Sequence, residues 1–538
     1  MNLSSYNPSP DEIEFLNLGY NYQICKRYDA MHKQVELEVL FNNLLVLRKD
    51  GLIAFDDRLD AELTREGYIH RNVPVRSSVS PRLRRAAKSL KENCNIVVLK
   101  TDKGSSYVVM DRCEYIKKLD CITSNSDKFK KITHDPTGDI KQRTNKLIDK
   151  LSTYINDCAL TKLVGDFSPA YLYGTVKVHK NDYPLRPIIS QCPTATYNLA
   201  KYMNKLLIPY CPHQFSLRSS QEFVDLIHGC SSDGIMASLD VESLFTNVPV
   251  EDTILLIICD YVYRHSSLPP LPFPEELLAD VLRICTLDSP FRHPGGGLFV
   301  QIDGVAMGSP LGPLFADYYM GHLESAVFET FNNKPLLYAR YVDDIFILVA
   351  SEKEILDLKE KFEEKSVLTF TYENSSKTNQ LAFLDTLVTK TSKGLTSSVY
   401  VKPSNSGVCL NFNSECPDRY KASVVYSYLI RAYKLSEDWN SFHEEIIRIK
   451  QLLVNNNYTN AFVDNIIYKF VSRTVQCNSN EADVNVSTHL HLGPGVVDEV
   501  PLFYCNQMHP NYALDERAIK QIIRRNVVLC QIEDSYIL

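Results

Sequence analysis

The stretch from Leu337 to Val349 constrains the fold more than any other part of the chain. It is an apolar, β-prone run that is interrupted near its middle by Asp343 and Asp344. Two buried strands joined by a tight turn would place this pair of carboxylates at the tip of a hairpin. Negative charge at the edge of a core is costly unless it is neutralised, and Arg340 is the one basic residue within the run. A metal ion is therefore a natural partner for the pair, although a polar hairpin turn is the simpler alternative because Asp is common in turns.

Residues 235–241 form a second short apolar run, which places Asp240 near its end. Two-metal phosphoryl transfer needs carboxylates that hold two ions about 3.5–4 Å apart. Such oxygen ligands favour Mg²⁺, with Mn²⁺ as the second choice. The sequence therefore predicts that Asp240, Asp343 and Asp344 are catalytic metal ligands. The alternative for Asp240 is a helix cap or a turn cap.

The overall charge of the chain neither supports nor excludes a nucleic-acid partner. The net charge is -7, whereas contacts to phosphate require Lys and Arg. Between Glu62 and Lys91, however, eight basic residues stand against two acids. This segment either contacts nucleic acid or forms a solvated helix face.

The cysteines and the apolar segments indicate a compartment. The 15 cysteines are scattered and form no CxxC pair, which is typical of free thiols in a reducing environment. The N-terminus has no basic region followed by an apolar run, so it does not read as a secretory signal. No stretch approaches the roughly 18–20 apolar residues that a membrane helix needs. We therefore expect an intracellular protein with no membrane partner.

Hydrophobic periodicity predicts a mixed chain of helices and strands. Helices are expected at 11–18, 31–47, 112–163, 251–263, 274–287, 311–328, 352–365, 421–433, 439–455, 458–471 and 513–525, and another begins at Ser80-Pro81. Strands are expected at 96–99, 107–110, 171–179, 185–190, 235–239, 298–302, 304–307, 368–372, 382–390 and 397–401, with a hairpin at 336–350. Residues 476–488 have the composition of a polar linker.

Four motifs in a fixed order resemble those of reverse transcriptases. Ser238-Leu239-Asp240 with 243–249 resembles the first palm motif, and 304–313 resembles the template- and nucleotide-positioning motif. Tyr341-Val342-Asp343-Asp344 resembles the YxDD box, and the fourth motif follows at 382–385. Segments 100–104, 173–180, 185–188, 401–403, 410–412 and 506–512 are similar to those of Penelope-like retroelement reverse transcriptases, which are relatives of telomerase. The resemblance spans nearly the whole chain.

The resemblance implies an α+β right-hand polymerase with an antiparallel-sheet palm, fingers and a helical thumb. Its expected parts are an N-terminal helical region at 1–95, fingers at 96–234, a palm at 235–400, a thumb at 401–475, and a linker with a C-terminal helical segment at 476–538. The implied activity is RNA-directed DNA polymerisation, in which a nucleotidyltransferase extends a primer 3′-OH with dNTPs. The implied partners are an RNA template and a DNA primer, and the implied location is the nucleus with passage through the cytoplasm.

The family motifs also imply roles for individual side chains. Lys177 and Arg186 would contact the incoming triphosphate, and a guanidinium fork suits phosphate geometry. Phe245 stands in the place of the sugar-selecting aromatic that excludes a 2′-hydroxyl. Gly308 and Ser309 would let the backbone approach the primer-template. For Lys177 a solvent-facing strand lysine remains the alternative, and for Phe245 a core phenylalanine.

The chain departs from the family pattern in ways that leave alternatives open. Met307 stands where many relatives carry Gln, and no GIY-YIG endonuclease pair is found. The chain could therefore be a truncated copy or a member of an endonuclease-lacking lineage. A catalytically inactive or domesticated nucleic-acid-binding derivative and an RNA-directed RNA polymerase are the competing functions. His489, His491, Cys505 and His509 match no zinc-site spacing.

Overall fold

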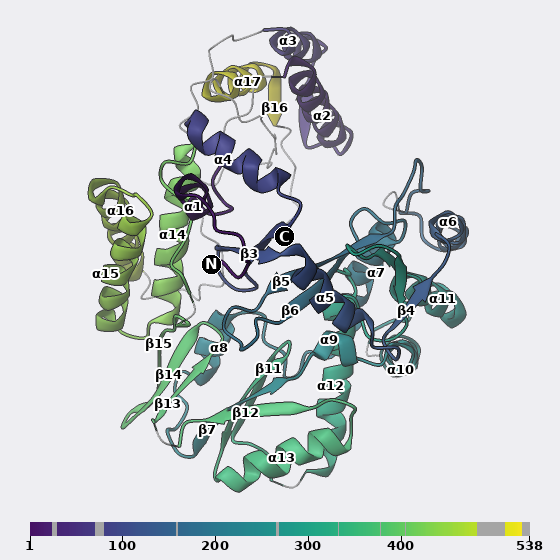
Figure 1. Ribbon diagram of the computed structural model, residues 1–538, viewed down its shortest axis with the longest axis vertical. Helices are drawn as coiled ribbons and strands as arrows, with labels where there is room; N and C mark the ends of the chain where they lie inside the picture. The colour runs from purple at the N-terminus through teal and green to yellow at the C-terminus, as the bar shows by residue number, and fades with distance from the viewer. Residues whose placement is uncertain are drawn as a thin grey trace. The chain divides into compact units, whose positions relative to one another are not determined.

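The computed structural model describes residues 1–23, 29–69, 80–157, 160–264, 268–331, 333–376, 378–403, 405–480 and 512–529, with the side chains at 475–480, 512, 513 and 529 excepted. The chain divides into two compact units (Figure 1). The first comprises Met1–Tyr20, Ser89–Val408 and Ser427–Leu452. The second comprises Asn21–Lys88, Cys409–Tyr426 and Leu453–Leu538. Helices α4 (Pro81–Glu92), α14 (Asp418–Leu435) and α15 (Trp439–Asn455) contribute residues to both units.

A four-stranded antiparallel sheet lies at the centre of the first unit, with the strand order β10-β11-β7-β12. Its strands are β7 (Ile235–Val241), β10 (Leu337–Tyr341), β11 (Asp344–Val349) and β12 (Phe370–Asn374). Side chains alternate between the two faces of a strand. Ile345 and Ile347 of β11 point into the main core, whereas Phe346 points into a second core. Burial on both faces explains why this stretch of sequence is almost uninterruptedly apolar.

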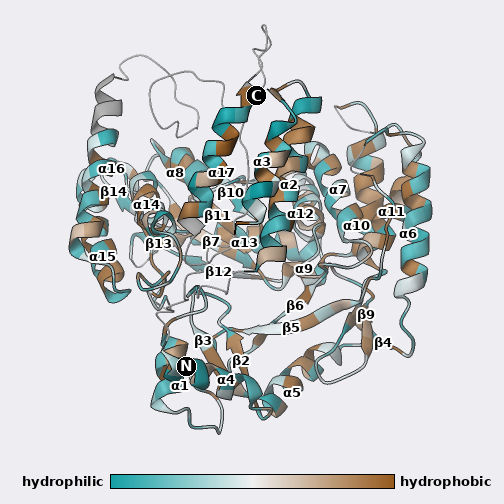
Figure 2. Ribbon diagram, turned by 90° about the horizontal axis from the view of Figure 1, so that it is seen from above, coloured by the Kyte–Doolittle hydropathy of each residue, from teal (hydrophilic) through white to brown (hydrophobic). Residues whose placement is uncertain are grey.

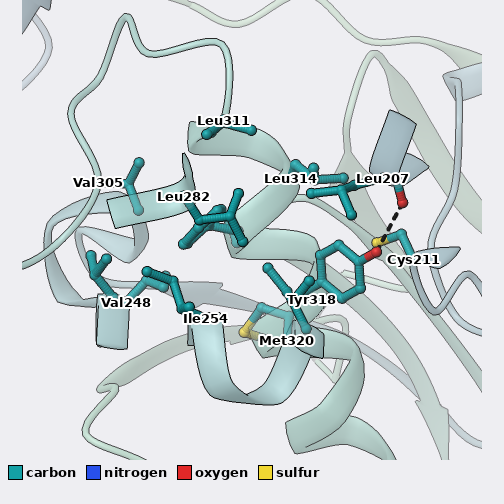
Figure 3. Packing of buried hydrophobic residues seen from close by; sticks show 14 of the residues in the cluster. Leu207, Cys211, Val248, Ile254, Leu282, Val305, Leu311, Leu314, Tyr318 and Met320 are labelled. Carbon is teal, nitrogen blue, oxygen red and sulfur yellow. Dashed lines mark hydrogen bonds between the residues drawn. The ribbon is translucent and has the colours of Figure 1, made fainter. Parts of the chain in front are cut away.

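Helices α12 (Gly312–Thr330) and α13 (Glu352–Glu364) supply the main core beneath this sheet. Helix α12 begins at Gly312 and has Pro313 in its first turn, where a backbone N–H would have no partner within the helix. Figure 3 shows Leu311, Leu314 and Tyr318 from this segment packed among apolar side chains of neighbouring helices. The buried Tyr318 hydroxyl donates to the carbonyl of Leu207 at 2.8 Å, so its polar atom is satisfied.

A mixed five-stranded sheet has the order β4-β9-β8-β5-β6. Its strands are β4 (Phe129–Ile132), β5 (Ala170–Val176), β6 (Leu185–Ser190), β8 (Pro290–Arg292) and β9 (Leu298–Gln301), and β5 pairs with β8 in parallel. The hairpin of β2 (Ile96–Lys100) and β3 (Tyr107–Asp111) is joined to it by a bridge between Thr101 and Val176. A third sheet, in the order β13-β14-β15, consists of Gln380–Phe383, Thr386–Thr391 and Gly394–Val399.

Helices surround these sheets in the first unit. They are α1 (Pro10–Asn17), α5 (Arg112–Thr123), α6 (Thr137–Ser152), α7 (Tyr197–Leu207), α8 (Ser220–Ile227), α9 (Leu244–Asn247), α10 (Val250–Leu256) and α11 (Glu275–Thr286), with a 3-10 turn at Ile208–Tyr210 and a π-helical segment at Ile257–Tyr263. In Figure 2, α6 and α11 each carry both hydrophobic and hydrophilic residues. Their apolar sides bury Leu147, Leu151, Leu278 and Leu282 in the main core.

The second unit joins distant parts of the sequence. It contains α2 (Ala30–Lys49), α3 (Arg58–Gly67), α16 (Asn460–Asn480) and α17 (Tyr512–Asn526), and β1 (Ile53–Phe55) pairs with β16 (Val527–Leu529). Leu40, Leu59 and Ile519 share one apolar cluster. The buried amine of Lys33 lies 3.2 Å from the Asp515 carboxylate. The attraction between the two charges offsets the cost of withdrawing each of them from water.

Most of the predicted elements are confirmed. The helix at 439–455 has the predicted bounds, the one predicted at 31–47 runs from Ala30 to Lys49, and the one predicted at 311–328 runs from Gly312 to Thr330. The hairpins at 96–110, 171–190 and 336–350 are present. Within the described ranges, no helix is both long and apolar enough to cross a bilayer.

Other predicted elements are wrong. The stretch 112–163 is not continuous helix, because strand β4 separates α5 from α6. Residues 382–390 contain a turn between β13 and β14. In the strand-turn pattern predicted at 298–307, the strand is β9 and residues 304–307 form no strand. Residues 476–480 continue α16 instead of starting a linker. The rest of that linker, the segment 506–511, the histidine and cysteine group at 489–509, and Arg71 and Arg76 lie outside the described residues.

Candidate active site

Backbone pairing brings the three predicted acidic residues together. Strand β11 runs antiparallel to β7, and Asp344 is the register partner of Asp240. Opposed residues of this kind have Cα atoms about 4.5–5.5 Å apart. The amide of Val241 donates to the carbonyl of Asp343 at 3.1 Å, which ties the hairpin turn to the end of β7. Asp240, Asp343 and Asp344 therefore converge at one end of two adjacent strands.

The turn between β10 and β11 has Val342 and Asp343 as its central residues, because Tyr341 pairs with Asp344. Val342 has a φ of 56°, in the left-handed region that β-branched residues rarely adopt. Such strain persists only where the surroundings hold it. The Val342 carbonyl accepts a hydrogen bond from Arg340 Nη1 at 3.2 Å, and this contact supports the turn from below.

Arg340 does not neutralise the aspartates of the turn. Its side chain is 0% exposed, and its Nε lies 2.6 Å from Glu324 while Nη1 lies 2.8 Å from Asp317. Tyr338 donates its hydroxyl to the same Glu324 at 2.8 Å. The one basic residue within the run is thus committed to acids in α12, and Asp343 and Asp344 are left for another cation.

The electrostatics of the site fit such a cation. Burial raises the pKa of Asp240, and the charge of Asp343 adds to the shift. Burial raises the pKa of Asp344 to about 6, with Asp343 and Asp240 as the next causes. Like charges that repel one another in this way are stabilised by a divalent cation between them. In the part of the chain that the structure describes, no group of three or more His, Cys, Asp or Glu side chains is arranged so that it could hold a metal ion.

The β5–β6 hairpin carries the two predicted triphosphate ligands. Lys177 follows β5, and its amide donates to the Pro184 carbonyl at 2.9 Å across the hairpin. Burial lowers the pKa of the Lys177 amine, and Arg186 and Lys180 add to the shift, whereas Asp102 and Asp240 oppose it. Lys177 and Arg186 therefore lie together, and Lys177 is within electrostatic reach of Asp240.

Phe245 is half-buried at the start of α9. Its ring packs on the main core, and its carbonyl accepts from the Val305 amide at 2.7 Å. A Cβ added to Gly312 would lie 3.7 Å from its ring. Phe245 therefore contacts the core on one side and keeps part of its ring exposed, so both interpretations made from the sequence remain compatible with its position.

Gly308 and Ser309 have structural duties within the fold. Gly308 has a φ of 122°, and an added Cβ would lie 2.5 Å from the Ile189 carbonyl oxygen. The neighbouring Met307 carbonyl accepts from the Ile189 amide at 2.9 Å. The Ser309 hydroxyl is buried and accepts from the Leu311 amide at 3.3 Å before α12. The glycine at 308 is therefore required by the close approach of β6, a cause that the sequence did not reveal.

The sequence analysis missed Asp102 and Lys103 as functional candidates. The Asp102 side chain is 4% exposed, and its Oδ1 lies 3.0 Å from Arg186 Nε. Lys103 acts on the charges of both Asp240 and Asp344. The signal was present, because residues 100–104 were among the segments that resemble Penelope-like enzymes, but their position near the acids depends on pairing between distant strands.

Comparison with known proteins places this site within a family domain. Residues 178–393 match the reverse transcriptase (RNA-dependent DNA polymerase) family, and residues 408–468 match the animal helix-turn-helix domain. The reverse transcriptase match includes Arg186, Asp240, Asp343 and Asp344. No curated protein matches the chain.

Three solved structures are similar to this chain. The telomerase of Candida albicans, in complex with a TWJ fragment of telomeric RNA, is 12% identical with a TM-score of 0.50, and the match covers 95% of this chain and 87% of that one. The apo telomerase of Candida tropicalis is 10% identical with a TM-score of 0.41, covering 79% and 83%. A sicinivirus RNA-dependent RNA polymerase is 10% identical with a TM-score of 0.38, covering 62% and 70%.

At 12% identity the Candida albicans likeness shows the fold alone, which is an α+β right-hand polymerase fold with antiparallel sheets. The family match adds the type of domain. This chain contains, at residues 178–393, a reverse transcriptase domain, the nucleotidyltransferase domain of RNA-dependent DNA polymerases.

Proposed function

We propose that the chain is the RNA-directed DNA polymerase of a Penelope-like retroelement and that it extends a primer 3′-OH with dNTPs. The observation that carries the proposal is the strand register that sets Asp240 opposite Asp344, at the turn that holds Asp343. The cationic β5–β6 hairpin within electrostatic reach of these acids supports it. The division into an N-terminal region, fingers, palm, thumb and C-terminal segment at the boundaries predicted from the sequence belongs to the same proposal.

Asp240, Asp343 and Asp344 would hold Mg²⁺, and Mn²⁺ could replace it. Reverse transcriptase domains generally use divalent metal ions, which lower the pKa of the attacking hydroxyl and stabilise the leaving pyrophosphate when bound. Burial raises the pKa of Asp240 and Asp344, and the charge of Asp343 adds to both shifts, which supports a cation at this place.

The remaining side chains would bind and orient the substrates. Lys177 and Arg186 would contact the triphosphate, so that the primer 3′-OH attacks the α-phosphate in line. The exposed part of Phe245 would exclude a 2′-hydroxyl. The backbone at Gly308 and Ser309 would lie beside the primer-template. The partners are an RNA template and a DNA primer, and the protein would work in the nucleus after passage through the cytoplasm.

Primer extension on an RNA template tests the proposal. The purified chain is given a DNA primer with dNTPs or rNTPs, in Mg²⁺, Mn²⁺ or EDTA. We expect dNTP incorporation that requires a divalent ion. Preferential rNTP incorporation would instead assign an RNA-directed RNA polymerase. Binding of the primer-template without extension under any metal condition would assign a catalytically inactive, domesticated nucleic-acid-binding derivative.

A further inference from the structure

The loop between β2 and β3 is joined to the cationic hairpin by backbone contacts. The Asp102 amide donates to the Val176 carbonyl at 2.9 Å, and Thr101 bridges to the same Val176. The Thr175 hydroxyl donates to Asp102 Oδ1 at 3.2 Å. The loop therefore keeps a fixed position against the end of β5, although it lies more than 70 residues away in sequence.

Asp102 contacts Arg186, a residue of that hairpin that is proposed to bind the triphosphate. Its Oδ1 lies 3.0 Å from Arg186 Nε, while the Arg186 side chain remains 40% exposed. Asp102 Oδ2 is buried with no hydrogen-bond partner. A buried carboxylate is retained at a cost in free energy that its pairing with an arginine offsets. Arg186 Nε also lacks a hydrogen-bond partner, so its contact with Asp102 is an ion pair and not a hydrogen bond. This ion pair restrains the guanidinium, and the exposed part of the side chain stays available to an anion.

Lys103, the next residue in the loop, extends the positive charge toward the acidic residues. Partial burial lowers the pKa of its amine, and the nearby amine of Lys402 adds to the shift. Cations crowded together in this way attract an anion, because a phosphate relieves their repulsion.

We propose that the loop Asp102–Ser105 is a third part of the nucleotide site, in which Asp102 is a positioning residue for Arg186 and Lys103 is a further ligand of the polyphosphate chain. The inference rests on the proposed function for the identity of the ligand as a dNTP. Its physical content, an ordered site for a linear polyphosphate, does not depend on turnover.

The direction in which Asp102→Asn changes the affinity for a polyanion distinguishes a positioning role of Asp102 from a purely electrostatic one. If Asp102 contributed only its negative charge, Asp102→Asn would strengthen the binding of a polyanion. If Asp102 holds Arg186 in place, the same variant weakens binding, because a displaced guanidinium no longer meets the phosphate oxygens. Asp182→Asn is the matched control, because it removes an exposed acid from the turn of the same hairpin.

The experiment measures two quantities on the full-length chain. The first is the affinity for inorganic tripolyphosphate by isothermal titration calorimetry in EDTA. The second is the KM for dNTP and kcat in primer extension. For Asp102→Asn we expect binding about tenfold weaker and a KM about tenfold higher with a smaller change in kcat, whereas Asp182→Asn binds as well as or better than wild type.

Three further variants complete the test. Asp102→Asn combined with Arg186→Ala should be no worse than Arg186→Ala alone, because a positioning residue acts through its partner. Lys103→Gln should weaken tripolyphosphate binding several-fold more than Lys100→Gln, which removes an exposed lysine three residues earlier. If Asp102→Asn does not fold, Thr175→Val removes the hydroxyl that binds Asp102 while keeping the β-branched shape, and should act in the same direction.

The outcomes distinguish the two proposals. Weaker tripolyphosphate binding by Asp102→Asn and Lys103→Gln in a chain that extends no primer would uphold the site and overturn the polymerase. A chain that extends primers, with Asp102→Asn and Asp182→Asn alike in both assays, would overturn the positioning role. Additive losses in the double variant would overturn it as well.

Discussion

Two hairpins of the first unit carry opposite charge, and each is held by one buried residue of the sign opposite to its own. The β10–β11 hairpin presents Asp343 and Asp344, and the buried Arg340 bonds the turn from within. The β5–β6 hairpin presents Lys177 and Arg186, and the buried Asp102 contacts Arg186. A single buried counter-charge can orient a group of like charges without neutralising all of it.

The two hairpins differ in how much of them the core covers. Strand β11 is buried on both faces after Asp344, whereas β5 alternates buried residues with the exposed Tyr171 and Tyr173. Arg340 is paired with two acids and Asp102 with one arginine, and each keeps one buried polar atom, Arg340 Nη2 and Asp102 Oδ2, without a hydrogen-bond partner. The acidic hairpin is thus built as a rigid part of the core, and the cationic hairpin as a face that is open to a ligand.

Breaking the buried support of the acidic hairpin should have the largest effect on stability. Arg340→Met leaves the buried Glu324 without its cationic partner, with only the Tyr338 hydroxyl still bound to it. We expect a loss of about 3–5 kcal/mol in the free energy of unfolding, measured by urea denaturation. Adding Glu324→Gln should restore part of that loss. A single variant as stable as wild type would show that the pair does not anchor the hairpin.

The contact that fixes the cationic hairpin can be broken at Gly308. Gly308→Ala adds a Cβ 2.5 Å from the Ile189 carbonyl, and we expect a cost above the roughly 1–3 kcal/mol of backbone strain alone. Gly296→Ala is the control, because Gly296 also has a positive φ, 102°, but its Cβ would meet nothing within 4 Å. Equal unfolding midpoints for the two variants would contradict the close approach of Gly308 to the Ile189 carbonyl in β6.

Phe245, in α9, should select the sugar of the incoming nucleotide. We expect Phe245→Ala to admit ribonucleotides and to lower the preference for dNTP over rNTP by at least about tenfold, within the range of one lost steric contact. The ratio of kcat/KM values in primer extension measures this preference, and Phe245→Tyr, which keeps the ring, should retain it. Unchanged discrimination in Phe245→Ala would leave Phe245 as a core residue only.

The burial of Asp344, together with repulsion from Asp343 and Asp240, gives the smallest predicted effect. The pKa of Asp344 rises from the usual 3.8 to about 6 in the folded chain, so ionisation between these values costs stability as the pH increases. In EDTA, Asp344→Asn should therefore unfold at the same temperature as wild type near pH 4 and roughly 1–3 °C higher near pH 7.5. A difference in unfolding temperature that does not depend on pH would contradict the raised pKa of Asp344.

Local patterns were enough to predict the acidic hairpin. The largely apolar run at 337–349 indicates burial on both faces, and Asp240 lies near the end of a strand of the same kind. Strand β4 was missed because Phe129-Lys130-Lys131-Ile132 carries exposed lysines at its centre. Its pairing with β9 is set by a partner about 170 residues away, which local periodicity does not encode.

Residues whose importance lies in a distant contact were misread or missed. Arg340 was the basic residue nearest the aspartates in sequence, yet it points to Glu324 and Asp317. Asp102 gains its meaning from Arg186, on a different hairpin. The pairing of β1 with β16 joins residues that are far apart in the sequence, and the local pattern of neither segment predicts its partner strand.

The central claim is that carboxylates brought together by the β7–β11 register carry out nucleotide transfer. Asp343→Asn tests it most directly, because the backbone carbonyl that binds the Val241 amide is unchanged and the fold should be preserved. The matched control is Glu373→Gln, an exposed acid of β12 in the same sheet. In Mg²⁺-dependent primer extension, we predict a rate at least about 1,000-fold lower for Asp343→Asn and a wild-type rate for the control. Equal rates for Asp343→Asn and wild type would contradict the account.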